Sequence, residues 1–151
     1  MWPFPGEKHF FSKEENELIV QSIREAERQT SGEVRIFVEG RCKYVEPLDR
    51  AAEIFTELKM ENTKYRNGVL FYVAIKDKQL AIFADSGIHA AAGDQYWKDV
   101  VRQILLVFSK DSVAKGMVTS ITAIGEALKI YFPFDKDVDK NELPDEIIFS
   151  V

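Results

Sequence analysis

Two carboxylates, Asp85 and Asp94, bracket a stretch of small residues that follows an apolar run. Residues 85–94 read Asp-Ser-Gly-Ile-His-Ala-Ala-Ala-Gly-Asp. Hard divalent cations prefer oxygen ligands, and a loop of small residues can supply backbone carbonyls beside its carboxylates. Asp85 and Asp94 are therefore candidate ligands of a divalent cation.

Two further acidic residues, Glu33 and Glu39, are candidates that depend on the direction of the strand between them. If this strand runs parallel to the next strand, Glu33 lies near Asp85 and Asn67 is close by. Glu39 and Asp77 then mark the opposite edge of the sheet, as a second cluster. If the strand is reversed, Glu39 lies near Asp85 instead. Both directions remain open, so Glu33 and Glu39 are both predicted metal ligands.

Each candidate also has a plain structural interpretation. Asp94 could cap the helix that follows it, and Asp77 lies between two lysines in a turn. Glu33 and Glu39 could be exposed residues on a strand. His89 is interpreted as a loop residue, because calcium and magnesium prefer oxygen. Asp85 is therefore the ligand that the sequence supports best.

The acidic tail has the spacing of an EF-hand calcium loop without its other features. The matching positions are one, three, five, seven and twelve of the loop, occupied by Asp135, Asp137, Asp139, Asn141 and Glu146. Lys140 stands where the loop needs glycine, and Pro144 falls inside it. A solvated tail, or one docked at a sheet edge, is the preferred interpretation.

Sequence motifs of the common enzyme classes are missing. The chain has no Gly-x-x-x-x-Gly-Lys-Ser/Thr phosphate loop, no Gly-x-Gly-x-x-Gly after the first strand and no Gly-x-Ser-x-Gly elbow. Neither His9 nor His89 has a nucleophile beside it. The single cysteine, Cys42, excludes an intrachain disulfide and a multi-cysteine zinc site. These observations favour a binding domain over an enzyme.

Apolar periodicity predicts the elements that position these residues. Ser12 and Glu15 form a capping box at the start of the first helix, and Val34, Ile36 and Val38 alternate as in a strand. Helices are predicted over 13–29, 48–58, 95–108 and 113–132, and strands over 33–39, 68–75 and 79–84, with a loop over 85–93. Helices on both faces of a sheet bury these apolar stripes best, which predicts a three-layer αβα sandwich. A segment of the tail could add to one sheet edge.

Length and charge predict one compact acidic domain. The 151 residues carry 25 acidic and 20 basic side chains, a formal charge of −5, which argues against nucleic-acid binding. We expect a single domain over 1–151, with an arm over 1–11 and an acidic tail over 134–151. The start of the chain lacks a leader pattern, and no apolar run is long enough to span a bilayer. A cytoplasmic monomer without membrane insertion is therefore predicted.

Several segments together resemble the TPM-domain family, in its stand-alone cytoplasmic bacterial form. They are Thr30-Ser-Gly-Glu-Val-Arg35, Arg66-Asn-Gly-Val-Leu-Phe-Tyr-Val-Ala-Ile-Lys-Asp77, Ala81-Ile-Phe-Ala-Asp-Ser-Gly-Ile-His89, Gly93-Asp-x-x-Trp97 and Asn141-Glu-Leu-Pro-Asp-Glu146. The resemblance implies an αβα sandwich around a sheet of about four mixed strands. It also implies divalent-metal binding, calcium first and magnesium second, and for some thylakoid members acid phosphatase activity.

The function expected from these observations is cation binding that orders one or two loops and alters the surface offered to a protein partner of unknown identity. The alternative is a metal-dependent acid phosphatase. Against that alternative, no basic residues that could hold a phosphate surround Asp85 in the local sequence.

Overall fold

The computed structural model describes residues 10–110, 113–134 and 147–149. In chain order the elements are α1 (Lys13–Arg28), β1 (Glu33–Glu39), α2 (Pro47–Glu57), β2 (Gly68–Ala74), β3 (Gln79–Ala84), α3 (Ser86–Ala92), α4 (Asp94–Lys110), α5 (Val113–Tyr131) and β4 (Ile147–Phe149). Most of the predicted arm and of the acidic tail, including its EF-hand-like positions, lies outside the described residues.

The strands form a mixed sheet in the order β3-β2-β1-β4. β1 runs parallel to β2, and β3 returns antiparallel beside β2 after a short turn. At the other edge, the three-residue β4 pairs parallel with β1, so a tail segment does join the sheet. The predicted mixed α/β class is confirmed, with three full-length strands and the short β4.

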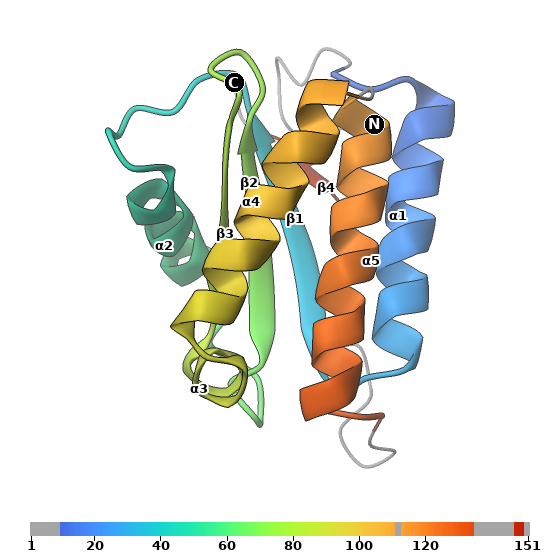
Figure 1. Cartoon of the computed structure of the whole chain (residues 1–151), viewed down its shortest axis with the longest axis vertical. Coiled ribbons are helices and arrows are strands. Elements are labelled where there is room, and N and C mark those ends of the chain that lie inside the picture. Colours follow the sequence, from blue (N-terminus) through green and yellow to red (C-terminus); the bar gives the residue numbers. More distant parts are fainter. Residues whose placement is uncertain (1–9, 111–112, 135–146, 150–151) are drawn as a thin grey trace.

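Helices cover both faces of this sheet (Figure 1). α1, α4 and α5 pack on one face, against alternate strand residues such as Val34 and Ile36. α2 covers the other face, where Ile54 and Phe55 meet residues such as Tyr72. The alternation of side chains along each strand therefore divides the core into two layers, as expected for an αβα sandwich.

The first helix begins at the predicted capping box. The Ser12 amide donates to Glu15 Oε1 at 2.8 Å, and the Glu15 amide donates to Ser12 Oγ at 3.1 Å. Ile19 and Ile23 follow at helical spacing and are fully buried against the sheet. The apolar stripe of α1 thus sets which of its faces meets the core.

The segment over 85–93, predicted as a loop, contains the helix α3. Asp85 is the N-cap residue, and its side chain accepts a hydrogen bond from the Ser86 amide. Gly93 ends the helix with a φ of 91°, in the left-handed region that glycine tolerates. The prediction of a loop was wrong because three of the small residues are alanines, which favour helix more than any other residue.

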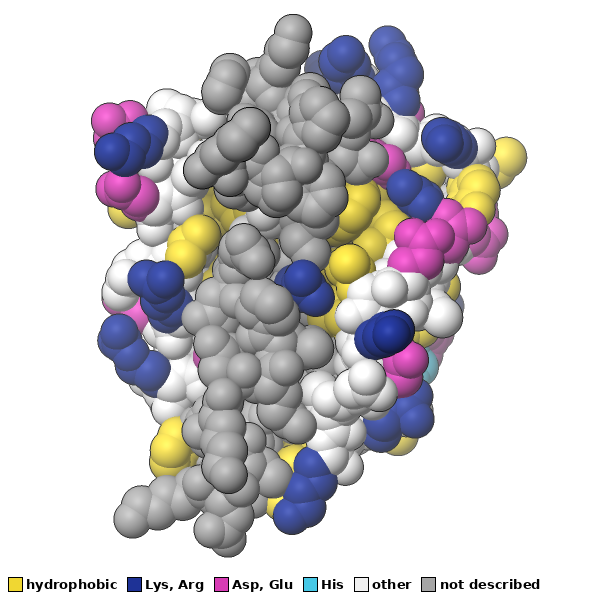
Figure 2. Space-filling view, turned by 180° about the vertical axis from the view of Figure 1, so that it is seen from behind, with side chains coloured by type: hydrophobic (Ala, Val, Ile, Leu, Met, Phe, Trp, Pro, Cys, Tyr) yellow, Lys and Arg dark blue, Asp and Glu magenta, His cyan; other side chains and the backbone are white. Residues whose placement is uncertain are grey.

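The two longest helices, α4 and α5, have 17 and 19 residues. α5 lies between α1 and α4 and carries many buried residues (Figure 1). Seen from behind, the described surface mixes basic and acidic side chains (Figure 2). Among the helices described, none combines the length and the apolar character needed to cross a bilayer.

Candidate cation site

The parallel pairing of β1 and β2 brings Glu33 and Asp85 to the same end of the sheet. Glu33 lies opposite Gly68, and from the other side the Asp85 amide donates to the Gly68 carbonyl at 2.9 Å. Neighbouring residues in register point to the same sheet face. Glu33 and Asp85 therefore lie on either side of Gly68, which has no side chain. Both residues are only 3% exposed. Of the two strand directions left open by the sequence, the parallel one is correct.

The Asp85 carboxylate accepts hydrogen bonds from one side chain and one backbone amide. Arg66 donates through Nε to Oδ2 at 2.7 Å and through Nη2 to Oδ1 at 2.8 Å, and the Ser86 amide donates to Oδ1 at 2.7 Å. The hydrogen bonds to Asp85 raise the pKa of Arg66. The Asp85 side chain is 4% exposed and that of Arg66 is 51% exposed. Arg66 therefore covers Asp85 from the solvent side and supplies the basic residue that the local sequence lacks.

Backbone contacts hold the two halves of this ion pair in place. The Arg66 carbonyl accepts from the amides of Gly87 and Ile88 at 2.8 and 3.3 Å. A Cβ atom at Gly87 would lie 2.0 Å from the Tyr65 carbonyl oxygen, so only glycine permits this approach. Arg66 itself has a φ of 51°, which is uncommon for a residue with a side chain. The start of α3 and the entry to β2 are thus fixed to each other through their main chains.

Asn67 places a further oxygen at this end of the sheet. The residue is fully buried. Its side-chain Nδ2 donates to Ser31 Oγ at 3.3 Å, and its backbone carbonyl accepts from the Glu33 amide at 3.4 Å. Its Oδ1 accepts no hydrogen bond from the part of the chain that the structure describes. Buried oxygens without a donor are rare in folded proteins and call for an explanation. A ligand is one such explanation.

Glu39 lies at the opposite end of β1 and is held by α2 and β2. Arg50 donates through Nε to Oε2 at 2.9 Å and through Nη2 to Oε1 at 3.1 Å, and the Tyr72 hydroxyl also donates to Oε2. The hydrogen bonds to Glu39 raise the pKa of Arg50, whereas burial, followed by the hydrogen bond to Glu39, raises the pKa of Tyr72. Glu39 therefore joins α2 to the sheet and lies away from Asp85.

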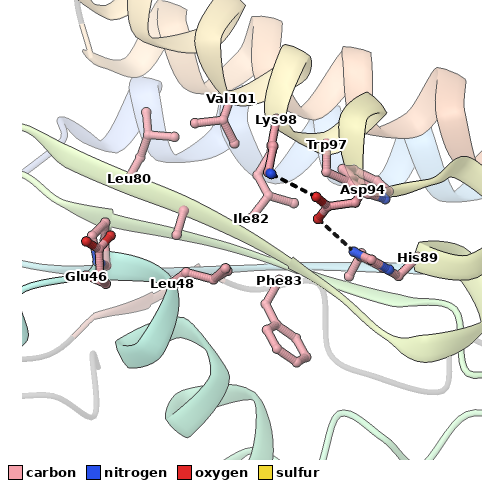
Figure 3. A pocket seen from close by; sticks show the side chains of 13 residues that line it. Glu46, Leu48, Leu80, Ile82, Phe83, His89, Asp94, Trp97, Lys98 and Val101 are labelled. Carbon is pink, nitrogen blue, oxygen red and sulfur yellow. Dashed lines mark ion pairs between the residues drawn. The ribbon is translucent and has the colours of Figure 1, made fainter.

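Asp94 lies beyond α3, at the first position of α4. Its exposed carboxylate pairs with Lys98 Nζ at 2.9 Å and lies 3.5 Å from His89 Nε2 (Figure 3). The hydrogen bond to Lys98 lowers the pKa of Asp94. A negative charge in the first turn is also favoured by the helix dipole. Asp94 thus lies inside the first turn of α4, where its carboxylate pairs with Lys98 one turn further along the helix. Asp77 similarly lies in the β2–β3 turn, where it pairs with Arg41 at 2.7 Å.

The predicted ligands therefore occupy three separate places. Glu33 and Asp85 share one sheet end, Glu39 lies at the other, and Asp94 is outside both. Within the described ranges, no group of three or more His, Cys, Asp or Glu side chains could hold one metal ion. A cation at the first place would draw on Glu33, Asp85 and the Asn67 oxygen, and it would have to replace Arg66 on Asp85. The oxygen ligands at this place suit a hard cation. The Arg66 guanidinium opposes cation binding, because it already occupies Asp85.

Sequence reasoning missed the two arginines that pair with these carboxylates. The sequence did indicate that a positive partner was needed, because a carboxylate next to a strand buried on both faces requires a counter-charge. Nothing local identifies the partner, since Arg66 and Arg50 lie 19 and 11 residues from the carboxylates that they bind.

Comparisons with known proteins agree with this architecture. A family model described as the TPM domain matches residues 6–127. The NMR structure of the BA42 protein from the psychrophilic bacterium Bizionia argentinensis is 41% identical, with a TM-score of 0.86 over 95% of this chain and 98% of that chain. The solution NMR structure of the N-terminal domain of a protein from P. gingivalis is 16% identical, with a TM-score of 0.67 over 83% of this chain and 81% of that chain, a likeness of fold alone. No curated protein matches significantly.

Proposed function

The chain belongs to the TPM-domain family, and from this premise we propose that it is a divalent-cation-binding domain whose site is the sheet end formed by Glu33 and Asp85. One observation carries the proposal: two carboxylates that are almost completely buried flank Gly68, which has no side chain to separate them. Burying carboxylates is costly unless positive charge compensates them. A calcium or magnesium ion is a compact source of that charge.

The oxygen inventory of this sheet end supports the same proposal. Asn67 Oδ1 is buried and receives no hydrogen bond among the described residues, and amide and carboxylate oxygens are ligands that calcium accepts. Calcium tolerates irregular sets of oxygens and keeps some water, whereas magnesium demands near-octahedral geometry. We therefore propose calcium as the preferred cation and magnesium as a weaker one.

In this proposal Arg66 occupies the cation position when no metal is bound. Its guanidinium contacts both oxygens of Asp85 while half of its side chain remains in water. A partly exposed arginine is not left inside the protein when it leaves, and the bound cation would then compensate the buried Asp85 carboxylate in its place. Cation binding would release Arg66 to the surface and tighten the backbone around residues 66–68 and 85–88. The surface offered to a partner protein would change accordingly.

A calcium titration of metal-stripped protein, followed by two-dimensional amide NMR, tests the proposal. We expect saturable shifts at Glu33, at residues 66–68 and at residues 85–88. Asp85→Asn should abolish them, and Asp94→Asn, which removes an exposed carboxylate, should leave them unchanged. Shifts that survive Asp85→Asn but disappear in Asp94→Asn would move the site to the outer end of α3.

Arg66→Gln provides a second variant that keeps both carboxylates. If the guanidinium competes with the cation, the calcium affinity should rise several-fold, and the pattern of shifted amides should stay the same. Lys64→Gln, which removes an exposed cation two residues away, is the matched control and should change the affinity little. A lower affinity in Arg66→Gln, in a variant that is still folded, would contradict the assigned role of Arg66.

The alternative, metal-dependent phosphatase activity, gains one observation from the structure. No basic residue lies near Asp85 in the local sequence, but the fold brings Arg66 from 19 residues away to contact Asp85 through two nitrogens. An arginine that turned from Asp85 could bind a phosphate bidentately. Turnover of an aryl phosphate that disappears in both Asp85→Asn and Arg66→Gln would favour this alternative over simple cation binding.

A further inference from the structure

The free edge of the sheet at β3 forms the floor of a groove, which we call the β3 groove. It encloses about 390 Å³ between the first turn of α2 and the first half of α4. In Figure 3, Leu80 and Val101 lie on one side of the β3 ribbon, and Leu48 and Phe83 lie on the other. A groove of this size is within the range of binding pockets.

The main chain of β3 presents a regular row of hydrogen-bonding groups to this groove. The Asp85 amide donates to the Gly68 carbonyl, so odd-numbered β3 residues bond to β2 in the antiparallel ladder. The amides and carbonyls of Leu80, Ile82 and Ala84 therefore point away from β2. Among the described residues, none of these groups is hydrogen-bonded outside the sheet.

β3 itself also lacks the charges, proline and bulge that natural edge strands use to prevent pairing. Its sequence, Gln-Leu-Ala-Ile-Phe-Ala, contains neither charge nor proline, and its register with β2 runs without a bulge. Edge strands are normally protected by such features, because an open edge is a template for another strand. On the α2 side of the groove, Leu48 is half exposed although it is apolar. Leu80, Ile82 and Ala84 are only 5–9% exposed, because α2 and α4 flank the groove, so a strand would reach this edge between the two helices.

We propose that the β3 groove binds an extended peptide segment of a partner protein, which adds to the sheet as a strand beside β3. The ladder hydrogen bonds would supply affinity, and alternate side chains would enter the apolar walls on the two sides. The charged groups of the lining are the carboxylates of Glu46 and Asp94 and the ammonium of Lys98, with His89 beside them. Because Lys98 is already paired with Asp94, the unmatched charge is negative. The segment that fits is apolar at alternate positions and carries lysine or arginine near Glu46.

A second copy of this chain fits the groove less well. Its own β3 would arrive with its α2 and α4 on either side, and these helices would meet the walls of the first groove. A single extended segment carries no flanking helices. The proposed occupant is therefore a peptide strand and not a dimer partner.

The test uses a pool of capped heptapeptides with valine, isoleucine or tyrosine at alternate positions and lysine or arginine between them. Added to the full chain, the pool should slow amide hydrogen exchange at Leu80, Ile82 and Ala84 and leave Ala81 and Phe83, which bond to β2, unchanged. The same pool N-methylated on alternate backbone amides keeps its side chains and should have no effect. Equal protection by both pools, or no protection by either, would overturn the proposal.

Two substitutions test how much the charge of Glu46 contributes to peptide binding, apart from the backbone hydrogen bonds of β3. Glu46→Lys should weaken binding of the basic pool about threefold, as expected for one exposed ion pair. Glu57→Lys, at the far end of the helix that Glu46 precedes and outside the groove lining, should leave binding unchanged. The chain could instead dimerise in sedimentation experiments, with the same amides protected in the absence of peptide and with less dimer in Glu46→Lys. That result would assign the groove to a second copy and overturn the proposal.

Discussion

Two buried carboxylates of this domain are each paired with an arginine, and the exposure of that arginine distinguishes them. The side chain of Arg50, on Glu39, is 13% exposed, whereas that of Arg66, on Asp85, is 51% exposed. An arginine that is already half in water is not left buried when another cation takes its place on the carboxylate. A buried arginine that loses its partner leaves an uncompensated charge inside the protein. Glu39 is therefore a structural residue, and Asp85 is the carboxylate at which one cation can replace another.

Glu39→Gln should destabilise the fold by about 3 kcal/mol, the usual cost of removing one partner of a buried ion pair. The amide keeps the size of the carboxylate but removes its charge, so that Arg50 keeps only its ion pair with the more exposed Glu53. Urea denaturation should show the loss as a lower midpoint. Glu57→Gln, an exposed change on the same helix that carries Arg50, should stay within about 0.5 kcal/mol. Equal midpoints for the two variants would show that the Glu39–Arg50 pair contributes nothing net.

At the scale of elements, the cation site depends on how closely α3 approaches the entry to β2. The helix is short, and its first turn is tied to the carbonyl of Arg66 by two amides. Gly87 makes this approach sterically permissible. The elements thus meet through backbone atoms, which cannot adjust as side chains do.

Gly87→Ala should therefore cost about 2–3 kcal/mol, as expected when a methyl group is forced into a packed contact. The new Cβ would lie 2.0 Å from a backbone oxygen, so α3 or the chain at 65–66 must move. Chemical denaturation measures the loss of stability. The calcium affinity, measured by titration, should also fall, because Asp85 is displaced. In Gly40→Ala the nearest atom would be a Lys76 side-chain carbon at 3.5 Å, so that control should be nearly neutral. A neutral Gly87→Ala would refute the close approach.

The strands were easier to predict from the sequence than the site. The bounds of β1 and β3 agree with the predicted 33–39 and 79–84, because alternation and flanking turn residues mark both ends of each strand. The direction of β1 could not be predicted, since an alternating pattern reads the same in both directions. The ion pairs also escaped prediction, because they join residues that only the folded chain brings together. The sequence did identify Glu33 and Asp85, which the parallel pairing places at one sheet end.

At the scale of the whole molecule, the sheet is completed by a strand that comes more than one hundred positions after its neighbour. Ile147 pairs with Ile36 in register, and its side chain is buried in the core shared with α1, α4 and α5. Nonlocal pairing of this kind has to close a long loop before it contributes stability. β4 is short, but through Ile147 it belongs to the main core.

Ile147→Ala should lower the free energy of unfolding by about 3 kcal/mol, the range observed for truncating a buried isoleucine. The loss follows from the removed apolar contacts and from the cavity that remains. Ile130→Ala, at an exposed position of α5, removes the same atoms and should change stability by no more than about 0.5 kcal/mol. Similar midpoints in a denaturant titration of the two variants would mean that β4 does not contribute to the core.

The pairing of β1 with β4 has a consequence for how the protein is made. A ribosome adds roughly 5–20 residues per second, so several seconds pass between the synthesis of β1 and that of its partner at residues 147–149. During that interval one side of β1 has no strand beside it, and α1 and α5 have an incomplete surface on which to pack. An open strand edge is a template for other chains. The nascent domain is therefore more prone to aggregate before residues 147–149 are made, and its yield in the cell depends on what shields β1 until then.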